Sequence, residues 1–98
     1  MTIDQCKNGT EMRLALNGRL DTVTLPELEA IISSELDGVT DLTLDLAGLD
    51  HISSAGLRVL LRAQEKMAAA GTMKPVGVSP IIMEIFGITG FNEILTIE

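Results

Sequence analysis

Residues 49–61, with the sequence LDHISSAGLRVLL, decide the fold of this chain. They follow a segment at 41–46 in which leucines alternate with polar residues, and this period of two predicts a β-strand with one buried face. After residue 53 the apolar residues take the spacing of an amphipathic helix, which we expect to end at Gly71. The stretch therefore predicts a strand that leads through a short junction into a helix.

Ser53 and Ser54 lie at this junction, where the helix begins. The first N–H groups of a helix have no partner within it, and a serine oxygen is a good acceptor for them. A capping role alone would therefore account for both serines. The helix dipole also makes this place favourable for an anion, so the alternative is that one serine carries a phosphate in one state of the protein.

The predicted helix has two distinct faces. The face expected to pack on the sheet carries Leu57, Leu60, Leu61, Gln64, Met67 and Ala68. The opposite face carries Arg58, Arg62, Glu65, Lys66 and Ala69. Such a charged face usually contacts only water. Because this acidic chain concentrates positive charge beside the serines, a surface that binds a protein partner is the alternative.

The charge and composition exclude several classes of function. The 98 residues, enough for one domain, include 14 acidic and 7 basic residues, and the net charge of −7 argues against nucleic acid and anionic membranes as partners. Two phenylalanines are the only aromatic residues, so stacking platforms for single-stranded nucleic acid are lacking. The single Cys6 fits a reducing compartment. With no leader pattern and no apolar run near the roughly 18 residues that span a bilayer, we expect a cytoplasmic protein without membrane insertion.

The segments before residue 41 predict a hairpin and a helix. A weak strand at 2–7 and an alternating strand at 12–17 flank the turn signal Asn8-Gly9, and Gly18 is expected to break the second strand. A loop at 19–22 follows. The sequence TLPE at 24–27 has the pattern of a capping box with proline in the first turn, and it predicts a helix that ends at Gly38.

The segments after residue 71 predict a strand, a helix and a terminal segment. Residues 75–78 form a candidate strand, and Ser79 and Pro80 open a helix expected to end at Gly87. Residues 94–97 are expected to form a last short strand or tail. The alternation of strands and helices predicts an α/β domain over 1–98, with a mixed sheet of four or five strands and three to four helices packed on it.

At this point the sequence resembles a STAS domain, the fold of the bacterial anti-sigma-factor antagonists. The resemblance covers nearly the whole chain. Its carriers are GRLD at 18–21, LDL at 44–46, ISSAGLRVLL at 52–61 and VSP at 78–80, followed by Phe86, Thr89, Gly90 and Phe91. None of these motifs is decisive alone, but their order and spacing together are specific.

The resemblance implies a function in partner switching, a form of signal transduction that regulates transcription. Proteins of this kind bind an anti-sigma factor that is also a serine kinase, and so free the sigma factor. The kinase phosphorylates a residue at the start of the second helix, after which the antagonist is released, and a phosphatase restores the binding form. The resemblance thus implies a binding module and phosphoprotein, not an enzyme, with no cofactor.

One departure from the family pattern affects the phosphorylation site. The pattern has an Asp, two Ser or Thr, and then Gly-Leu, with the phosphorylated residue just before the glycine, where this chain has Ala55. We prefer Ser54 as the acceptor, with Ser53 as the alternative, because Ser54 would lie four residues before Arg58 in the first turn. The expected partner-binding set is Asp21, Thr22, Asp50, Ser53, Ser54, Ala55, Gly56, Arg58 and Arg62.

Two alternatives remain at the level of sequence. One is a STAS scaffold subunit of a lipid or solute transport complex, in which no serine is phosphorylated. The other is a small hydrolase that uses Ser54 as nucleophile and His51 as base, although two residues in one tight junction rarely reach that geometry. With one histidine and one cysteine far apart, no metal-ligand spacing is present.

Overall fold

The computed structural model of the chain describes residues 1–90. Its elements, in chain order, are β1 (Thr2–Asn8), β2 (Glu11–Leu20), α1 (Leu25–Ser34), β3 (Asp41–Ile52), α2 (Ser54–Ala70), β4 (Thr72–Val76) and α3 (Pro80–Thr89). Residues 1–90 thus contain four strands and three helices, as the sequence predicts. The segment predicted at 94–97 lies outside the described residues.

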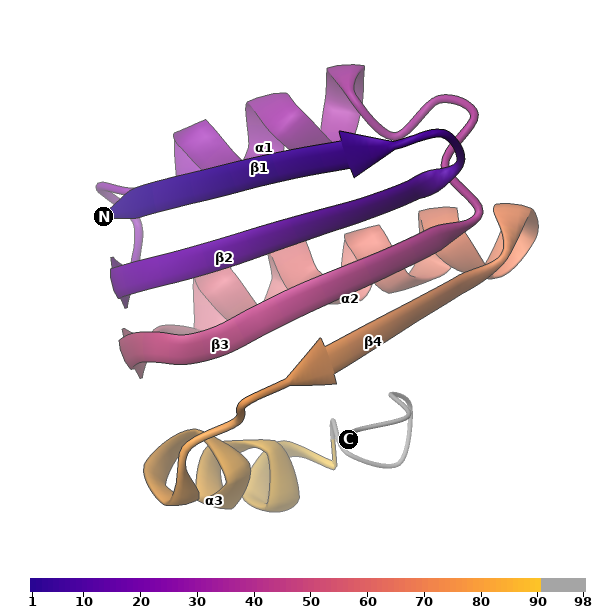
Figure 1. The fold of residues 1–98 in the computed structure, drawn as a ribbon. Helices are drawn as coiled ribbons and strands as arrows, with labels where there is room; N and C mark the ends of the chain where they lie inside the picture. Colours follow the sequence, from indigo (N-terminus) through magenta and orange to yellow (C-terminus); the bar gives the residue numbers. More distant parts are fainter. Residues whose placement is uncertain (91–98) are drawn as a thin grey trace.

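The four strands form one mixed sheet in the order β1-β2-β3-β4. β1 and β2 are the predicted antiparallel hairpin, whereas β2, β3 and β4 are parallel. The crossovers through α1 and α2 place both helices on the same face of the sheet, as Figure 1 shows. Because β2 and β3 are parallel, both end at one edge, where Leu20 pairs with Ile52. We call this the carboxyl edge.

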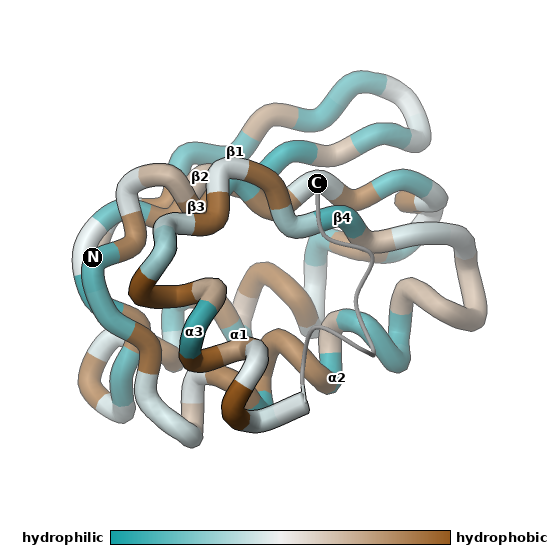
Figure 2. Tube along the Cα trace, turned by 90° about the horizontal axis from the view of Figure 1, so that it is seen from below, coloured by the Kyte–Doolittle hydropathy of each residue, from teal (hydrophilic) through white to brown (hydrophobic). Residues whose placement is uncertain are grey.

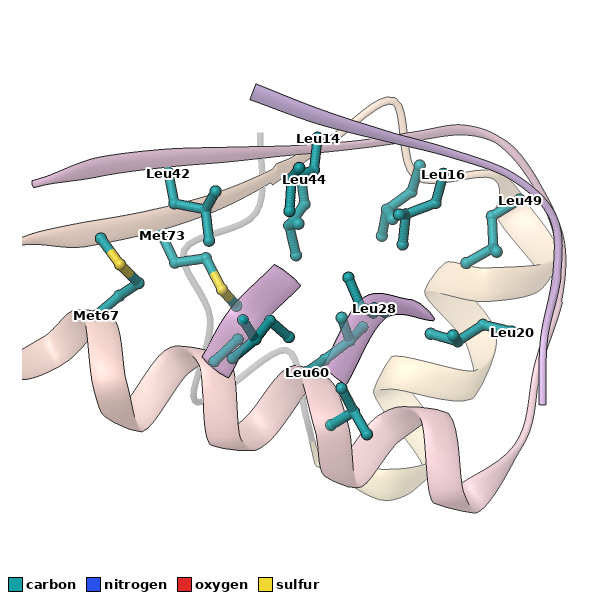
Figure 3. Close-up of a cluster of buried hydrophobic side chains, with 14 of the residues drawn as sticks. Leu14, Leu16, Leu20, Leu28, Leu42, Leu44, Leu49, Leu60, Met67 and Met73 are labelled. Atoms are coloured by element: carbon teal, nitrogen blue, oxygen red, sulfur yellow. The ribbon is translucent and has the colours of Figure 1, made fainter. Parts of the chain in front are cut away.

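The core lies between the sheet and the helices and consists mainly of leucine. Leu42, Leu44 and Leu46 are buried on one face of β3, as the alternation predicts, and Figure 3 shows leucines of several strands directed at α2. Burying such a side chain contributes about 1.5–3 kcal/mol. The core therefore fixes which face of β3 meets the helices.

α2 packs on the sheet through a stripe slightly rotated from the predicted one. Its buried residues are Gly56, Val59, Leu60, Ala63 and Met67. The predicted Leu57, Leu61 and Gln64 are only half-buried, and Ala68 is exposed, so the predicted stripe is partly wrong. Val59 and Ala63 are buried on the same side of α2 as Gly56, which packs closely against the end of β2.

The predicted break of the second strand at Gly18 is wrong. β2 continues to Leu20, and its pairing with β3 shifts register between Ala15 and Asn17 and again between Gly18 and Arg19. Gly18 has a φ of 107°, a conformation that glycine adopts readily, so it accommodates the irregularity without ending the strand. The extension brings Leu20 to the carboxyl edge.

Other predicted boundaries also differ from the observed ones. β3 runs to Ile52 instead of residue 46, and β4 covers 72–76 instead of 75–78. α1 ends at Ser34, before Gly38, because Glu35 is its C-cap and Leu36 turns into the core. α3 begins as predicted, with Ser79 as cap and Pro80 first, but it passes through Gly87 and ends at Thr89.

The helices of residues 1–90 include none that is both long and apolar enough to cross a membrane.

Candidate functional site

The two serines at the carboxyl edge have different roles in the fold. Ser53 is the N-cap of α2, in an extended conformation, and its Oγ accepts a hydrogen bond of 3.1 Å from the N–H of Gly56. Ser54 is the first residue of the helix and is exposed. Within residues 1–90 no hydrogen bond engages the Ser54 hydroxyl. The predicted division between a capping Ser53 and an accessible Ser54 is therefore the observed geometry.

This division predicts unequal effects on stability. Replacing Ser53 with alanine removes the cap of α2 and is expected to lower the free energy of unfolding by about 0.5–2 kcal/mol. Replacing Ser54 with alanine is expected to change it by less than about 0.5 kcal/mol, as for other exposed positions. Urea unfolding of the two variants measures the difference. Equal losses would show that the serines share the capping role.

The junction before α2 is joined directly to the end of β2. The N–H of Ser53 donates a hydrogen bond of 2.9 Å to the carbonyl oxygen of Leu20. One turn into the helix, a Cβ on Gly56 would lie 2.9 Å from Leu20 Cγ and 3.1 Å from the Leu20 carbonyl oxygen. Only glycine fits this approach without a shift. Gly56 is buried, and its role in the fold is to let α2 pack at the carboxyl edge. Its place in a partner-binding surface stays a prediction.

The loop that follows β2, residues 21–24, is fixed by its own hydrogen bonds, and we call it the fixed loop. Asp21 Oδ1 accepts the N–H groups of Val23, at 3.0 Å, and Thr24, at 3.2 Å. The Thr24 hydroxyl donates to the carbonyl oxygen of Arg19 at 2.6 Å, so the predicted capping box at 24–27 does not form. The hydrogen bond from the Thr24 N–H, with a further one from Val23, lowers the pKa of Asp21 below its ordinary value. The carboxylate that holds the loop is therefore ionised at neutral pH.

The positive charges on α2 extend from the same edge. Arg58 and Arg62 are exposed, and neither makes an ion pair with another described residue. Arg58 lies four residues after Ser54, the separation at which helical side chains are neighbours. Lys66 instead donates a hydrogen bond of 3.1 Å to the carbonyl oxygen of Ile32, which ties α2 to the end of α1. Arg58 and Arg62 are thus available to an anion or a partner.

The remaining predicted site residues also lie near this edge. Asp50 is an exposed residue near the end of β3, and Thr22 is exposed in the fixed loop. Ala55 is half-buried in the first turn of α2. Most of the predicted set therefore lies at the carboxyl edge, whereas Arg62 lies about two turns further along α2 and Gly56 is buried.

His51 does not form a catalytic pair with either serine. It is half-buried in β3, opposite Arg19, and within the described part of the chain no hydrogen bond joins it to Ser53 or Ser54. The Ser53 oxygen is already engaged as the helix cap. The hydrolase alternative therefore lacks its nucleophile–base contact here. Residues 1–90 also hold no group of three or more His, Cys, Asp and Glu side chains able to bind a metal ion.

Sequence reasoning missed two features of this edge. The packing role of Gly56 depends on Leu20, which is 36 positions away, and nothing local signals that contact. The hydrogen-bonded loop after β2 had a partial signal in the sequence. Asp21 and Thr24 are three residues apart, and side chains of these types often form hydrogen bonds to nearby backbone groups. That loop sets the position of Val23.

Comparisons with known proteins show the family to which this chain is related. The family model described as "Mlab, STAS domain" matches residues 3–96. The Bordetella bronchiseptica protein described as "Putative anti-sigma factor antagonist BtrV" is 37% identical over 84 residues, which cover 84% of this chain and 72% of BtrV.

Two solved structures share the fold. An anti-sigma factor antagonist from Mycobacterium paratuberculosis superposes with a TM-score of 0.87 at 24% identity, covering 98% of this chain and 83% of that one. The Bacillus cell fate determinant SpoIIAA, in its phosphorylated form, gives a TM-score of 0.77 at 20% identity, covering 99% and 91%. The chain belongs to the STAS domain family, in which its relatives include proteins named anti-sigma factor antagonists.

Proposed function

We propose that this chain is an anti-sigma-factor antagonist whose binding is switched by phosphorylation of Ser54. The unphosphorylated form binds an anti-sigma factor that is also a serine kinase, and phosphorylation at the start of α2 ends the complex. The observation that carries this proposal is the exposed Ser54 hydroxyl, which makes no hydrogen bond with any residue of positions 1–90 while Ser53 caps the helix.

Similarity to named proteins supports the proposed role. BtrV, which carries the name of an anti-sigma factor antagonist, matches this chain across both the fixed loop and α2, since 84% of the chain is covered. SpoIIAA has been solved in an unphosphorylated and a phosphorylated form. A phosphoserine phosphatase that resets the switch, and a cytoplasmic location shared with the transcription machinery, complete the proposed circuit.

The position of Ser54 explains how a phosphate would act. The group adds a charge of about −1.5 to −2, and at the amino end of a helix this charge is favourable by roughly 0.3–1 kcal/mol. Arg58 lies one turn away and has no ion-pair partner among the described residues. The phosphorylated protein therefore stays folded. Binding is lost locally, because the partner would have to bury a bulky dianion in a surface shaped for a hydroxyl.

The experiment is phosphate transfer from the partner kinase to the purified chain. The kinase is first captured on the unphosphorylated chain from source cells, identified and purified, and then incubated with the chain and ATP. Peptide mass spectrometry is expected to place the phosphate on Ser54, with transfer lost in Ser54→Ala and kept in Ser53→Ala. Phosphate found only on Ser53 or on a threonine would contradict the proposal. Stable association with a transporter ATPase, without modification, would indicate the scaffold alternative.

A further inference from the structure

We infer that Val23 is a fixed apolar contact for the same partner that covers Ser54, and this inference rests on the proposed function. The Val23 side chain is 83% exposed, the largest value among the exposed large hydrophobic residues of positions 1–90. While it is exposed, this side chain contributes no hydrophobic stabilisation to the isolated protein. Buried in an apolar pocket of a partner, it contributes binding free energy.

The loop holds Val23 in one position. Its own N–H donates to Asp21 Oδ1 at 3.0 Å, and the N–H of Leu25 donates to the Asp21 carbonyl oxygen at 2.9 Å. On the other side of Val23, the Thr24 hydroxyl donates a hydrogen bond to the carbonyl oxygen of Arg19 and accepts one of 3.1 Å from the N–H of Asp21. A side chain that is already ordered loses little conformational entropy on binding. The β-branched valine adds to this, because its χ1 angle is itself restricted.

Val23 and Ser54 belong to one continuous edge. Leu20, which precedes the loop, pairs with Ile52, and its carbonyl oxygen accepts the N–H of Ser53. The loop and the start of α2 therefore leave the sheet from adjacent strands. A partner surface that covers the Ser54 hydroxyl extends over the neighbouring loop.

The surroundings of Val23 define the chemistry of the partner's surface. Thr22 is exposed beside it, and the half-buried Asp21 carries a negative charge at neutral pH. The complementary surface is an apolar pocket sized for a valine, with polar or basic groups at its rim. A second strongly exposed apolar side chain belongs to α3: Figure 2 shows hydrophobic segments along that helix, where Ile88 is 80% exposed.

The test measures the affinity of the purified kinase for three loop and helix variants by calorimetry. Val23→Ser is expected to weaken binding about tenfold, because the serine has no apolar side chain to bury in the partner, whereas Val23→Ile, which keeps a β-branched apolar side chain, stays within about threefold of the wild type. Ile88→Ser is the matched control, because it removes an equally exposed apolar side chain from α3, and it is expected to bind within about twofold. Thermal unfolding should be unchanged in all three, because both positions face water.

The outcomes separate this inference from the proposed function. If Val23→Ser binds like the wild type while Ser54→Asp does not bind, the inference is wrong and the switch stands. A loss for Ile88→Ser as large as that for Val23→Ser would also contradict the inference, since binding would then follow exposed apolar area in general. If Ser54→Asp binds as tightly as the wild type, the proposed switch fails, whatever Val23 does.

Discussion

Replacing Ser54 with aspartate is expected to weaken binding of the partner kinase by about 100-fold, which corresponds to about 2.7 kcal/mol. The aspartate places a permanent charge where the partner would otherwise cover a neutral, exposed hydroxyl. The first turn of a helix tolerates a carboxylate well, so the variant should be at least as stable as the wild type. Calorimetric titration and urea unfolding measure both quantities.

A charge placed elsewhere tests whether position matters. Ser33 is an exposed serine near the end of α1, so Ser33→Asp adds the same charge to the same protein away from the carboxyl edge. We expect this variant to bind within about threefold of the wild type, in line with the small effects of remote surface charges. Ser54→Ala, which keeps the site neutral, should also retain binding. If both aspartate variants lost the same affinity for the partner, the cause would be the net charge of the protein and not the position of the charge.

Replacing Gly56 with alanine is expected to destabilise the protein by about 1–3 kcal/mol, the usual cost of overpacking. The added Cβ would lie 2.9 Å from Leu20 Cγ and 3.0 Å from Ile52 Cγ1, with the Leu20 carbonyl oxygen at 3.1 Å. The backbone oxygen cannot move as a side chain does, so the start of α2 must shift away from β2. We therefore expect the affinity for the partner to fall as well.

Gly87 supplies the matched control for this substitution. It is also a helical glycine, in α3, but a Cβ there would meet no atom of residues 1–90 within 4 Å. Gly87→Ala is expected to be neutral or to stabilise the protein by up to about 1 kcal/mol, since alanine has the higher helix propensity. Chemical unfolding of both variants gives the comparison. If the two alanines had the same effect, the crowded position of Gly56 would not matter.

Much of the fold follows from local patterns in the sequence. The alternation of leucines in 41–46 predicts which face of β3 is buried, and the Asn8-Gly9 turn predicts the β1–β2 hairpin. Ser53 and Ser79 are both observed as helix caps at the predicted positions. In each case the signal and the structure involve the same few residues, so no distant contact is needed to interpret it.

The wrong boundaries arise where glycine was interpreted as a break. Gly18 instead supports a register shift within β2, and Gly87 lies inside α3. Glycine permits a turn but does not impose one, and pairing with β3 outweighs the local preference at Gly18. The same distinction between local and distant contacts applies to the site. The different roles of Ser53 and Ser54 could be predicted because they depend only on how a helix begins. The packing of Gly56 on Leu20 and the exposure of Val23 could not, because they depend on how β2 and β3 end side by side.

The phosphorylation switch is tested most directly by comparing the chain in two states. The chain is prepared without phosphate and with one phosphate on Ser54, verified by intact mass and peptide mapping, and each form is titrated with the same purified kinase. We expect the phosphorylated form to bind at least about 100-fold more weakly, a loss of about 2.7 kcal/mol, and to be at least as stable to unfolding as the unmodified form. Equal affinities of the two forms, or a phosphorylated form that has lost its fold, would contradict the switch.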